Sequence, residues 1–200
     1  MLSVGHGRLS LAPGLSFNEV LHEYSLNGIR FEGVTRKIGE KLGLDYSKAT
    51  GIIEGRTDEG SNIHKWVQEW IDTGSMTCVH PGARWVKSAL ENKYSQGTTA
   101  VLRSEVLVSD LKHYASAIDL LVEQDGVSDI LDIKSGRFKP EYLAWQLGCY
   151  KWFLSLQGKE VRKCMCVCVH DKMIYNVRPR SFEDIEELLY GKGKLRQTTA

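Results

Sequence analysis

The sequence predicts an α/β domain with a central mixed β-sheet flanked by helices. Residues 58–74 and 140–156 carry apolar side chains at the three- and four-residue spacing of amphipathic helices. Between these two segments lie strand-like apolar runs bounded by turn residues. Helices and strands that alternate along a chain of 200 residues are typical of one domain in which helices cover a single sheet.

The first half of the chain is expected to form a hairpin and two helices after a loose N-terminal leader, residues 1–16. Asn27-Gly28, within HEYSLNGIRFEGVT, is a strong signal for a type I′ hairpin turn. The first helix is expected over 58–74, where a glycine can end it, and the second over 83–97.

Three strands, a long helix, a second hairpin and a closing helix are expected in the second half. The expected boundaries are 101–108, 114–123 and 127–134 for the strands, 140–156 for the helix, 161–179 for the hairpin and 181–191 for the last helix. Ser181 is the expected N-cap of the last helix, with Asp184 three residues later. Since no repeat, low-complexity tract or linker interrupts this order, residues 17–200 are expected to form one domain.

Composition indicates a compartment more clearly than a partner. The net charge is +1, which neither favours nor excludes nucleic acid, because the distribution of charge matters more than its sum. No apolar run approaches the ~20 residues of a membrane span, and the N-terminus lacks the apolar region of a signal peptide. The five cysteines are odd in number and show no disulfide spacing. A cytoplasmic protein without a membrane partner is therefore expected.

Three of the cysteines alternate within one expected strand. Cys164, Cys166 and Cys168 should therefore all point the same way. A ladder of this kind poorly suits one tetrahedral cluster, so we expect small buried side chains and no iron–sulfur cluster.

Charged residues interrupt two of the expected strands, within AIDLLVEQDGVSDILDIKSG. Strand residues alternate between faces, so Asp132 and Lys134 point to one side of the sheet. If Asp125-Gly126 form a two-residue turn, Asp119 stands opposite Asp132, with Cβ atoms about 4.5–5.5 Å apart. A one-residue bulge at the turn would separate the two carboxylates.

Two carboxylates at this distance need a positive partner. One alternative is a structural salt bridge to Lys134 on an exposed strand face. The other is a divalent cation, because paired carboxylates bind Mg²⁺ or Mn²⁺. A bound cation polarises a phosphate and lowers the pKa of water, and Lys134 would position that water or stabilise charge on the phosphate. The pattern therefore predicts a site that cleaves phosphodiester bonds.

These residues resemble the signature of the PD-(D/E)XK nuclease superfamily, with Asp119 as the first acid and Asp132-Ile133-Lys134 as the D-x-K. GSNIHKWVQEW resembles the Gly-x-x-x-His helix of the RecB-like branch, with Gly60 and His64, and QLGCY resembles its Gln-x-x-x-Tyr motif. HEYSLNGIRFEGVT is similar to the N-terminal segment of phage-type exonucleases in this superfamily. The resemblance covers residues 22–150, with four motifs in order.

The resemblance implies a restriction-endonuclease-like core and a role for each site residue. Asp119 and Asp132 would bind Mg²⁺ or Mn²⁺, with His64 and the Ile133 backbone carbonyl as further ligands. Lys134 would position or activate the attacking water. Residues expected to support the scissile strand are Gln146 and Tyr150, and those expected to contact DNA are Ser135, Arg137, Lys139 and Tyr150.

Two assignments stay open at this point. Glu105 matches a position where these nucleases often carry an acid, so it is either a further metal ligand or an edge-strand charge. Gln146 and Tyr150 are one helical turn apart, so they either line the cleft or form a hydrogen-bonded pair on a core helix.

The function implied by the resemblance is that of a metal-dependent DNA exonuclease in phage-type recombination, replication or repair, in the host cytoplasm if phage-encoded. DNA is the expected partner, and a single-strand annealing protein or a helicase would act in trans. The alternatives are a structure-specific endonuclease or nickase, a DNA-binding protein that does not cleave, and a structural metal-binding domain. Cleavage polarity and the choice between single and double strands stay open.

Overall fold

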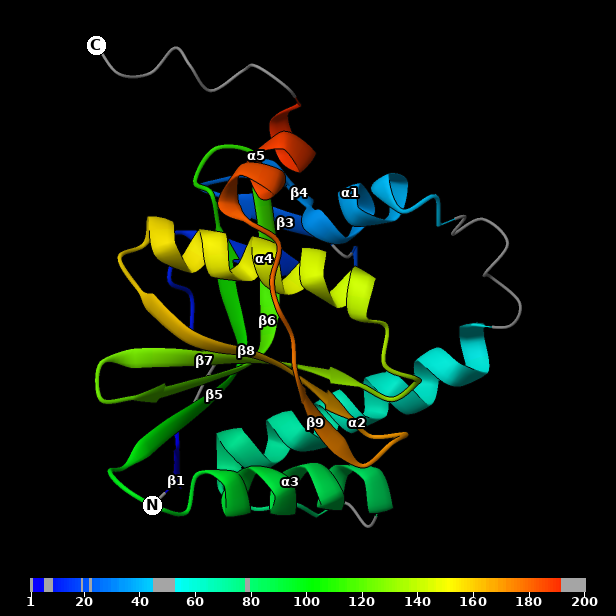
Figure 1. Ribbon diagram of the computed structural model, residues 1–200, viewed down its shortest axis with the longest axis vertical. Coiled ribbons are helices and arrows are strands. Elements are labelled where there is room, and N and C mark those ends of the chain that lie inside the picture. The colour runs from blue at the N-terminus through cyan, green and yellow to red at the C-terminus, as the bar shows by residue number, and fades with distance from the viewer. Residues whose placement is uncertain are drawn as a thin grey trace.

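The structure is a computed structural model that describes residues 2–5, 9–18, 20, 21, 23–44, 53–77 and 80–191, and of residues 53–59 and 61 the backbone alone. A mixed β-sheet flanked by helices confirms the expected α/β class (Figure 1). The elements in chain order are β1 (Leu2–Val4), β2 (Leu15–Asn18), β3 (Glu23–Leu26), β4 (Ile29–Gly33), α1 (Val34–Lys41), α2 (Ile53–Thr73), α3 (Pro81–Lys93), β5 (Ala100–Ser109), β6 (Tyr114–Gln124), β7 (Val127–Lys134), α4 (Pro140–Leu156), β8 (Glu160–Cys168), β9 (Met173–Asn176) and α5 (Phe182–Tyr190).

Strand β6 is the centre of the sheet. Antiparallel β5 pairs with one edge of β6, and β1 pairs in parallel with β5. Among the described residues, the other edge of β6 is paired with β4 at 114–115 and with β7 at 120–124. The sheet continues outward through β3 and β2 on one side and through β8 and β9 on the other. The stretch 116–119 therefore lies where β4 and β7 diverge.

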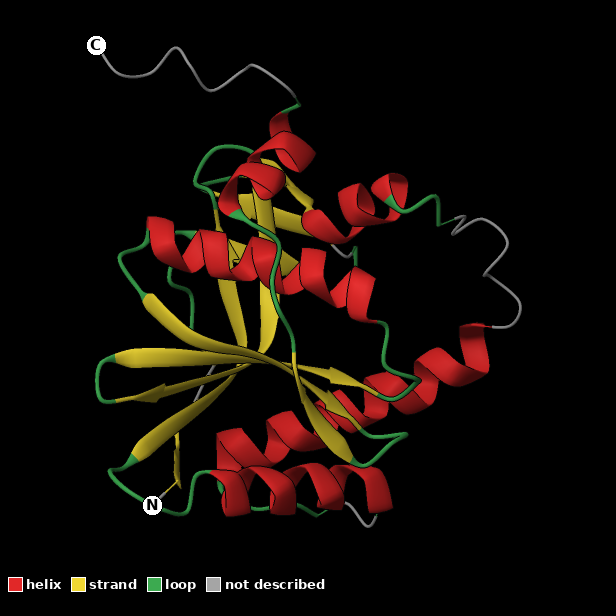
Figure 2. Cartoon of the chain, viewed as in Figure 1, coloured by secondary structure: helices red, strands yellow, loops and turns green. Residues whose placement is uncertain are grey.

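Helices cover both faces of the sheet (Figure 2). Helices α1, α4 and α5 pack on one face, over a core that includes Ile38, Leu147 and Ile185. On the other face, α2 and α3 pack over a second core. Alternate residues of β7 serve the two cores, Ile130 the first and Leu131 the second, as the two-residue period of a strand requires. No helix of the described residues is both long and apolar enough to cross a membrane.

The predicted hairpins and caps form. Asn27 and Gly28 have φ values of 50° and 83°, the positive values that a type I′ turn requires. Helix α4 begins and ends at the predicted residues. At the start of α5, the Ser181 side chain accepts a hydrogen bond from the Asp184 amide in a capping box.

The N-terminal leader is more ordered than the sequence predicted. Residues 1–16 are not loose where the structure describes them, because Leu2–Val4 forms β1 and pairs with β5. Ser10 makes a further bridge to Leu107. Since the partner strand lies far away along the chain, this pairing leaves no periodic signal in the leader itself.

Helix α1 was not predicted either. Its N-cap, Gly33, offers no side-chain hydrogen bond, and the helix has only two turns. Val34 and Ile38 are buried against the first core, so packing stabilises a helix that is too short to be recognised by pattern.

Asp129 of β7 provides a test of the packing at the start of this strand. Its side chain is 1% exposed and accepts hydrogen bonds from the Tyr94 hydroxyl at 2.9 Å and from Arg162 Nε and Nη2 at 2.9 and 2.8 Å. We expect Asp129→Ala to lower the free energy of unfolding by about 2–3 kcal/mol, because the buried Tyr94 hydroxyl loses its acceptor and Arg162 loses its charged partner. Urea unfolding followed by circular dichroism measures this loss. Glu91→Ala, at an exposed position of α3, should change the free energy of unfolding by less than about 1 kcal/mol. Equal losses in the two variants would contradict the expectation.

Candidate active site

Strands β6 and β7 bring the two predicted acids together. The turn that joins these strands has two residues, both with positive φ, and no bulge interrupts the pairing that follows it. The ladder ends at the pair Leu120–Leu131, and Asp119 and Asp132 are the next residues along the two strands. The register predicted from the sequence is therefore confirmed up to these two leucines.

The Asp119 carboxylate takes the place of a strand partner for β7. Asp119 Oδ2 accepts a hydrogen bond from the Ile133 main-chain N–H at 2.7 Å. An amide that would otherwise need a main-chain acceptor is thus satisfied by a charged oxygen, which is the stronger acceptor. The carboxylate is therefore fixed at the point where β7 leaves β6.

Helix α2 carries His64 to the same point. His64 Nε2 lies 3.1 Å from the Ile133 carbonyl oxygen, and Nδ1 lies 3.7 Å from Asp119 Oδ1. The helix approaches so closely because residue 60, one turn earlier, is glycine. A Cβ at Gly60 would lie 2.9 Å from Ser135 Oγ, closer than real contacts allow.

Glu105 of β5 joins this group. His64, Glu105 and Asp119 each offer a ligand atom within 4.8 Å of the other two. Glu105 has a φ of 49°, a left-handed value that costs a non-glycine residue about 1–3 kcal/mol. Even-numbered residues of both β5 and β6 face one core before this point and the other core after it. Glu105 and Asp119 therefore mark the place where the two paired strands turn over together.

The three side chains form a plausible donor set for a divalent cation. Mg²⁺ and Mn²⁺ take carboxylate and carbonyl oxygens, and Mn²⁺ also accepts imidazole nitrogen. The cluster of His64, Glu105 and Asp119 could therefore hold a metal ion, and the Ile133 carbonyl oxygen beside His64 is a further donor.

Asp132, the other expected ligand, lies outside this three-residue cluster. Its side chain is 0% exposed, and its Oδ2 lies 2.7 Å from Lys134 Nζ in an ion pair. Apart from this contact, neither carboxylate oxygen accepts a hydrogen bond from the described residues. A buried carboxylate left in this state retains the capacity to bind a second positive partner.

Burial and charge set the protonation of the ion pair. Burial raises the pKa of Asp132 to about 6 against the attraction of Lys134, and the Asp119 charge adds to the rise. For Lys134, burial favours the neutral amine, but the two carboxylates outweigh it and raise the pKa above its ordinary value. Lys134 is therefore a fixed positive charge beside the acids at neutral pH.

Gln146 and Tyr150 form a hydrogen-bonded pair inside the core. Gln146 Nε2 donates to the Tyr150 hydroxyl at 2.8 Å. Tyr150 is only 2% exposed, so the prediction that it contacts DNA must be corrected, because spacing along a helix gives the face of a residue and not its depth. Burial, and then the charges of Asp132 and Asp119, raise the pKa of Tyr150, which places the pair behind the two acids.

Ser116 and Tyr24 were not singled out in the sequence, yet they lie behind the same acids. Hydrogen bonds with Ser116 moderate the rise in pKa that burial gives to both Tyr24 and Tyr150. The pKa of Tyr24 reaches about 12, with the Glu105 charge contributing to the rise. A serine within the apolar run of β6 was the available signal for this network.

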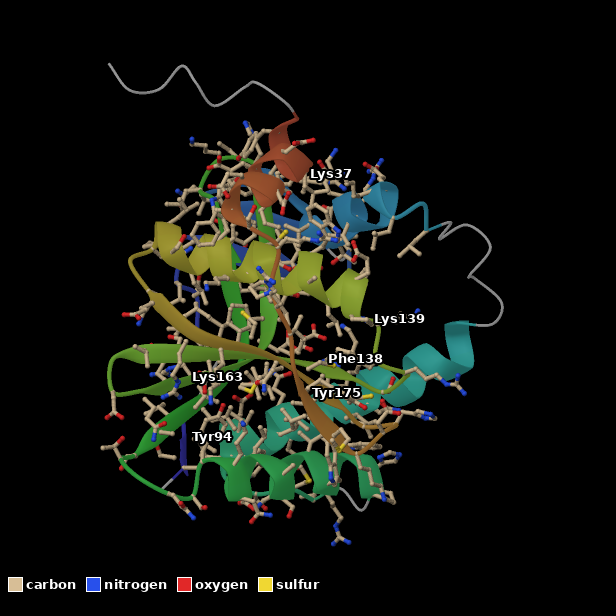
Figure 3. All side chains as sticks on the ribbon, in the orientation of Figure 1. Lys37, Tyr94, Phe138, Lys139, Lys163 and Tyr175 are labelled. Atoms are coloured by element: carbon tan, nitrogen blue, oxygen red, sulfur yellow. The ribbon has the colours of Figure 1, made fainter. Side chains whose placement is uncertain are left out.

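A cleft of about 830 Å³ opens beside these residues. Its lining from the site and from the loop between β7 and α4 comprises His64, Ile133, Lys134, Ser135, Gly136, Arg137 and Lys139. Figure 3 shows Phe138 and Lys139 on this loop, and the Phe138 ring stacks on Tyr175 of β9 with centroids 4.3 Å apart. The residues predicted to contact phosphates, other than Tyr150, are therefore at the cleft.

The three cysteines of β8 are buried on the face covered by α4, as predicted. Cys164, Cys166 and Cys168 belong to the first core, and burial raises the pKa of the first two to about 12. His22, where the resemblance begins, lies outside the described residues.

The structure thus gathers an imidazole, two carboxylates and a carbonyl oxygen next to the ion pair between Lys134 and the buried Asp132. No family model matches this chain, and no curated protein matches it.

The cluster of His64, Glu105 and Asp119 predicts that a divalent cation stabilises the folded protein. We expect Mn²⁺ to raise the Tm of the wild-type protein, because a ligand of the folded state alone adds about 2.7 kcal/mol at ~100 times its Kd. The Mn²⁺-induced rise in Tm should be mostly lost in Asp119→Asn and in His64→Ala. It should be kept in Glu91→Gln, a variant at an exposed position of α3. Thermal unfolding with and without Mn²⁺ measures the effect. An unchanged shift in both cluster variants would rule out binding at this cluster.

The ion pair between Lys134 and the buried Asp132 predicts that replacing Lys134 lowers the free energy of unfolding by an amount that depends on pH. In Lys134→Met the Asp132 charge is buried without compensation, so we expect a loss of about 3–5 kcal/mol at pH values near 8. Lys134 lowers the pKa of Asp132, which is about 6 in the wild-type protein, so this pKa is higher in the variant and the loss should shrink as the pH falls toward 6 and the carboxyl becomes neutral. Urea unfolding in EDTA across this range measures it, and a loss independent of pH would contradict the assignment.

Proposed function

We propose that this protein is a metal-dependent deoxyribonuclease that hydrolyses phosphodiester bonds as an exonuclease. The observation that carries the proposal is the grouping of His64, Glu105 and Asp119 beside the ion pair of Lys134 with the buried Asp132, at a cleft with basic residues. A binding protein would not need two acids and a lysine kept together at the cost of desolvation.

The cation would be held by the three-residue cluster, with the Ile133 carbonyl and the unsatisfied Asp132 oxygens as further donors. Bound Mg²⁺ or Mn²⁺ supplies Lewis acidity toward the phosphate and lowers the pKa of water. In the reaction, water adds to phosphorus and the ester oxygen leaves with a proton, so one product end carries phosphate and the other hydroxyl.

Lys134 acts in this proposal as a charge. Because its ammonium is held protonated by the neighbouring carboxylates, it stabilises negative charge on the phosphate and orients the attacking water. Ser135, Arg137 and Lys139 bind flanking phosphates from the loop after β7. Gln146 and Tyr150 hold α4 behind the acids and do not contact DNA.

A restriction-endonuclease-like core and a biological role are proposed together with this activity. Acids on adjacent strands, followed by a lysine two residues on, favour a restriction-endonuclease-like core within the mixed sheet. A role in phage-type recombination, replication or repair follows from the resemblance of the motifs, with a helicase or annealing protein in trans.

Cleavage of end-labelled linear DNA tests this function. We expect wild-type protein to release a labelled end early with Mg²⁺ or Mn²⁺ and not in EDTA. Lys134→Ala should lower the rate by at least about 100-fold, because a preorganised charge at the phosphate is lost.

Lys163→Ala is the matched control for this assay. Lys163 is exposed on β8 opposite Asp129, five strand positions or about 17 Å from the level of Lys134, and Figure 3 shows it far from Lys139. The control should cleave like wild type. Internal cuts without early end release would instead indicate an endonuclease or nickase, and retained binding without any cleavage would refute the enzymatic assignment.

A further inference from the structure

The cleft has two unlike walls. One wall is polar and carries the site residues and the basic loop described above. The other wall comes from the residues just after α1 and from the first turn of α4, and it is apolar apart from Glu141, which pairs with Arg180. Its residues are Leu42, Leu44, Pro140, Glu141, Tyr142 and Leu143. Phosphate binding alone gives no reason for this apolar wall.

The apolar wall borders the reacting centre directly. The Tyr142 ring centroid lies 5.9 Å from Lys134 Nζ. Leu44 is 44% exposed although it is a large apolar residue, and it lies on the same wall. A flat apolar group attached to the phosphate that Lys134 contacts would therefore lie against Tyr142 and Leu44.

Charge on the opposite side suits a phosphate backbone. Arg137 and Lys139 of this loop both line the cleft. A ligand that places phosphates along this loop and apolar ring faces on the opposite wall is a strand of nucleotides.

The size of the cleft limits how that strand is presented. A volume of about 830 Å³ lies within the range of small-molecule sites, about 300–1,000 Å³. In a duplex, base faces are stacked and base edges are paired, so a protein wall reaches only the groove edges. A base face becomes accessible in an unpaired strand, where the cost of unstacking is least.

We infer that the apolar wall is a nucleobase-binding subsite and that the substrate enters as the unpaired end of single-stranded DNA. This inference rests on the proposed function for the identity of the strand and adds to it the substrate class.

Binding of labelled oligonucleotides in EDTA tests the inference without turnover. The probes are an oligothymidylate of about ten nucleotides, the blunt duplex of the same length, and the same single strand with abasic residues at its ends. We expect the single strand to bind at least about tenfold more tightly than the duplex. Abasic ends should weaken binding about five- to tenfold, because the backbone is kept and only the base contacts are removed.

Leu44→Ser and Leu156→Ser form a matched pair of variants. The two leucines are 44% and 50% exposed, and Leu156 ends α4, about 24 Å from its cleft end. Leu44→Ser should weaken binding of the intact strand at least about threefold and reduce the penalty for abasic ends, while Leu156→Ser leaves both unchanged.

Three results would overturn the inference: equal or tighter binding of the duplex, no penalty for abasic ends, or equal effects of the two leucine variants. Its failure is distinct from failure of the proposed function. Metal-dependent release of labelled ends from duplex and single strand alike, without dependence on Leu44, would refute the subsite and leave the nuclease. Base-dependent binding of single strands without any cleavage would support the subsite and refute the nuclease.

Discussion

The structure depends on holding two like charges, Asp119 and Asp132, close together and away from water. Unit charges 4 Å apart interact by about 4 kcal/mol at an effective dielectric constant near 20, so each acid needs its own compensation. Asp119 receives it from the Ile133 amide, and Asp132 receives it from Lys134. Both partners belong to β7, so the pair of acids ties β6 and β7 into one arrangement, and His64 of α2 lies against the same point.

The shape of the sheet follows from the same constraint. At Asp119, the carboxylate takes the Ile133 amide and β7 diverges from β4 along the shared edge of β6. At Glu105, a left-handed backbone lets β5 turn over in step with β6, so the register between these strands is kept. The strained backbone of Glu105 and the divergence of β4 and β7 therefore lie at the same place as the three possible metal ligands His64, Glu105 and Asp119.

The cleft has lining residues of different character on its two walls. On the polar wall, charges are fixed before any ligand arrives, because Lys134 is held protonated and Asp119 is hydrogen-bonded. The apolar wall comes from α1 and α4, which pack on the opposite sheet face from α2. The lining of the cleft thus combines residues from helices of both layers of the fold with Ile133 and Lys134 of β7.

The sequence by itself determined the local features of this protein. Period-two alternation and the two-residue turn at Asp125-Gly126 placed Asp119 beside Asp132, and helical spacing made Gln146 a neighbour of Tyr150. Such features depend on rules that act over a few residues, so spacing is enough to predict them.

Only the tertiary structure decided which distant residues meet and how deeply they are buried. It joined Glu105 to His64 and Asp119, and it enclosed Tyr150 behind the acids. It also paired β1 with β5 and brought Leu44 to the same cleft as the basic loop. These outcomes arise from packing between segments far apart in the chain, and burial, which sets the pKa of Asp132 and Lys134, has no counterpart in sequence spacing.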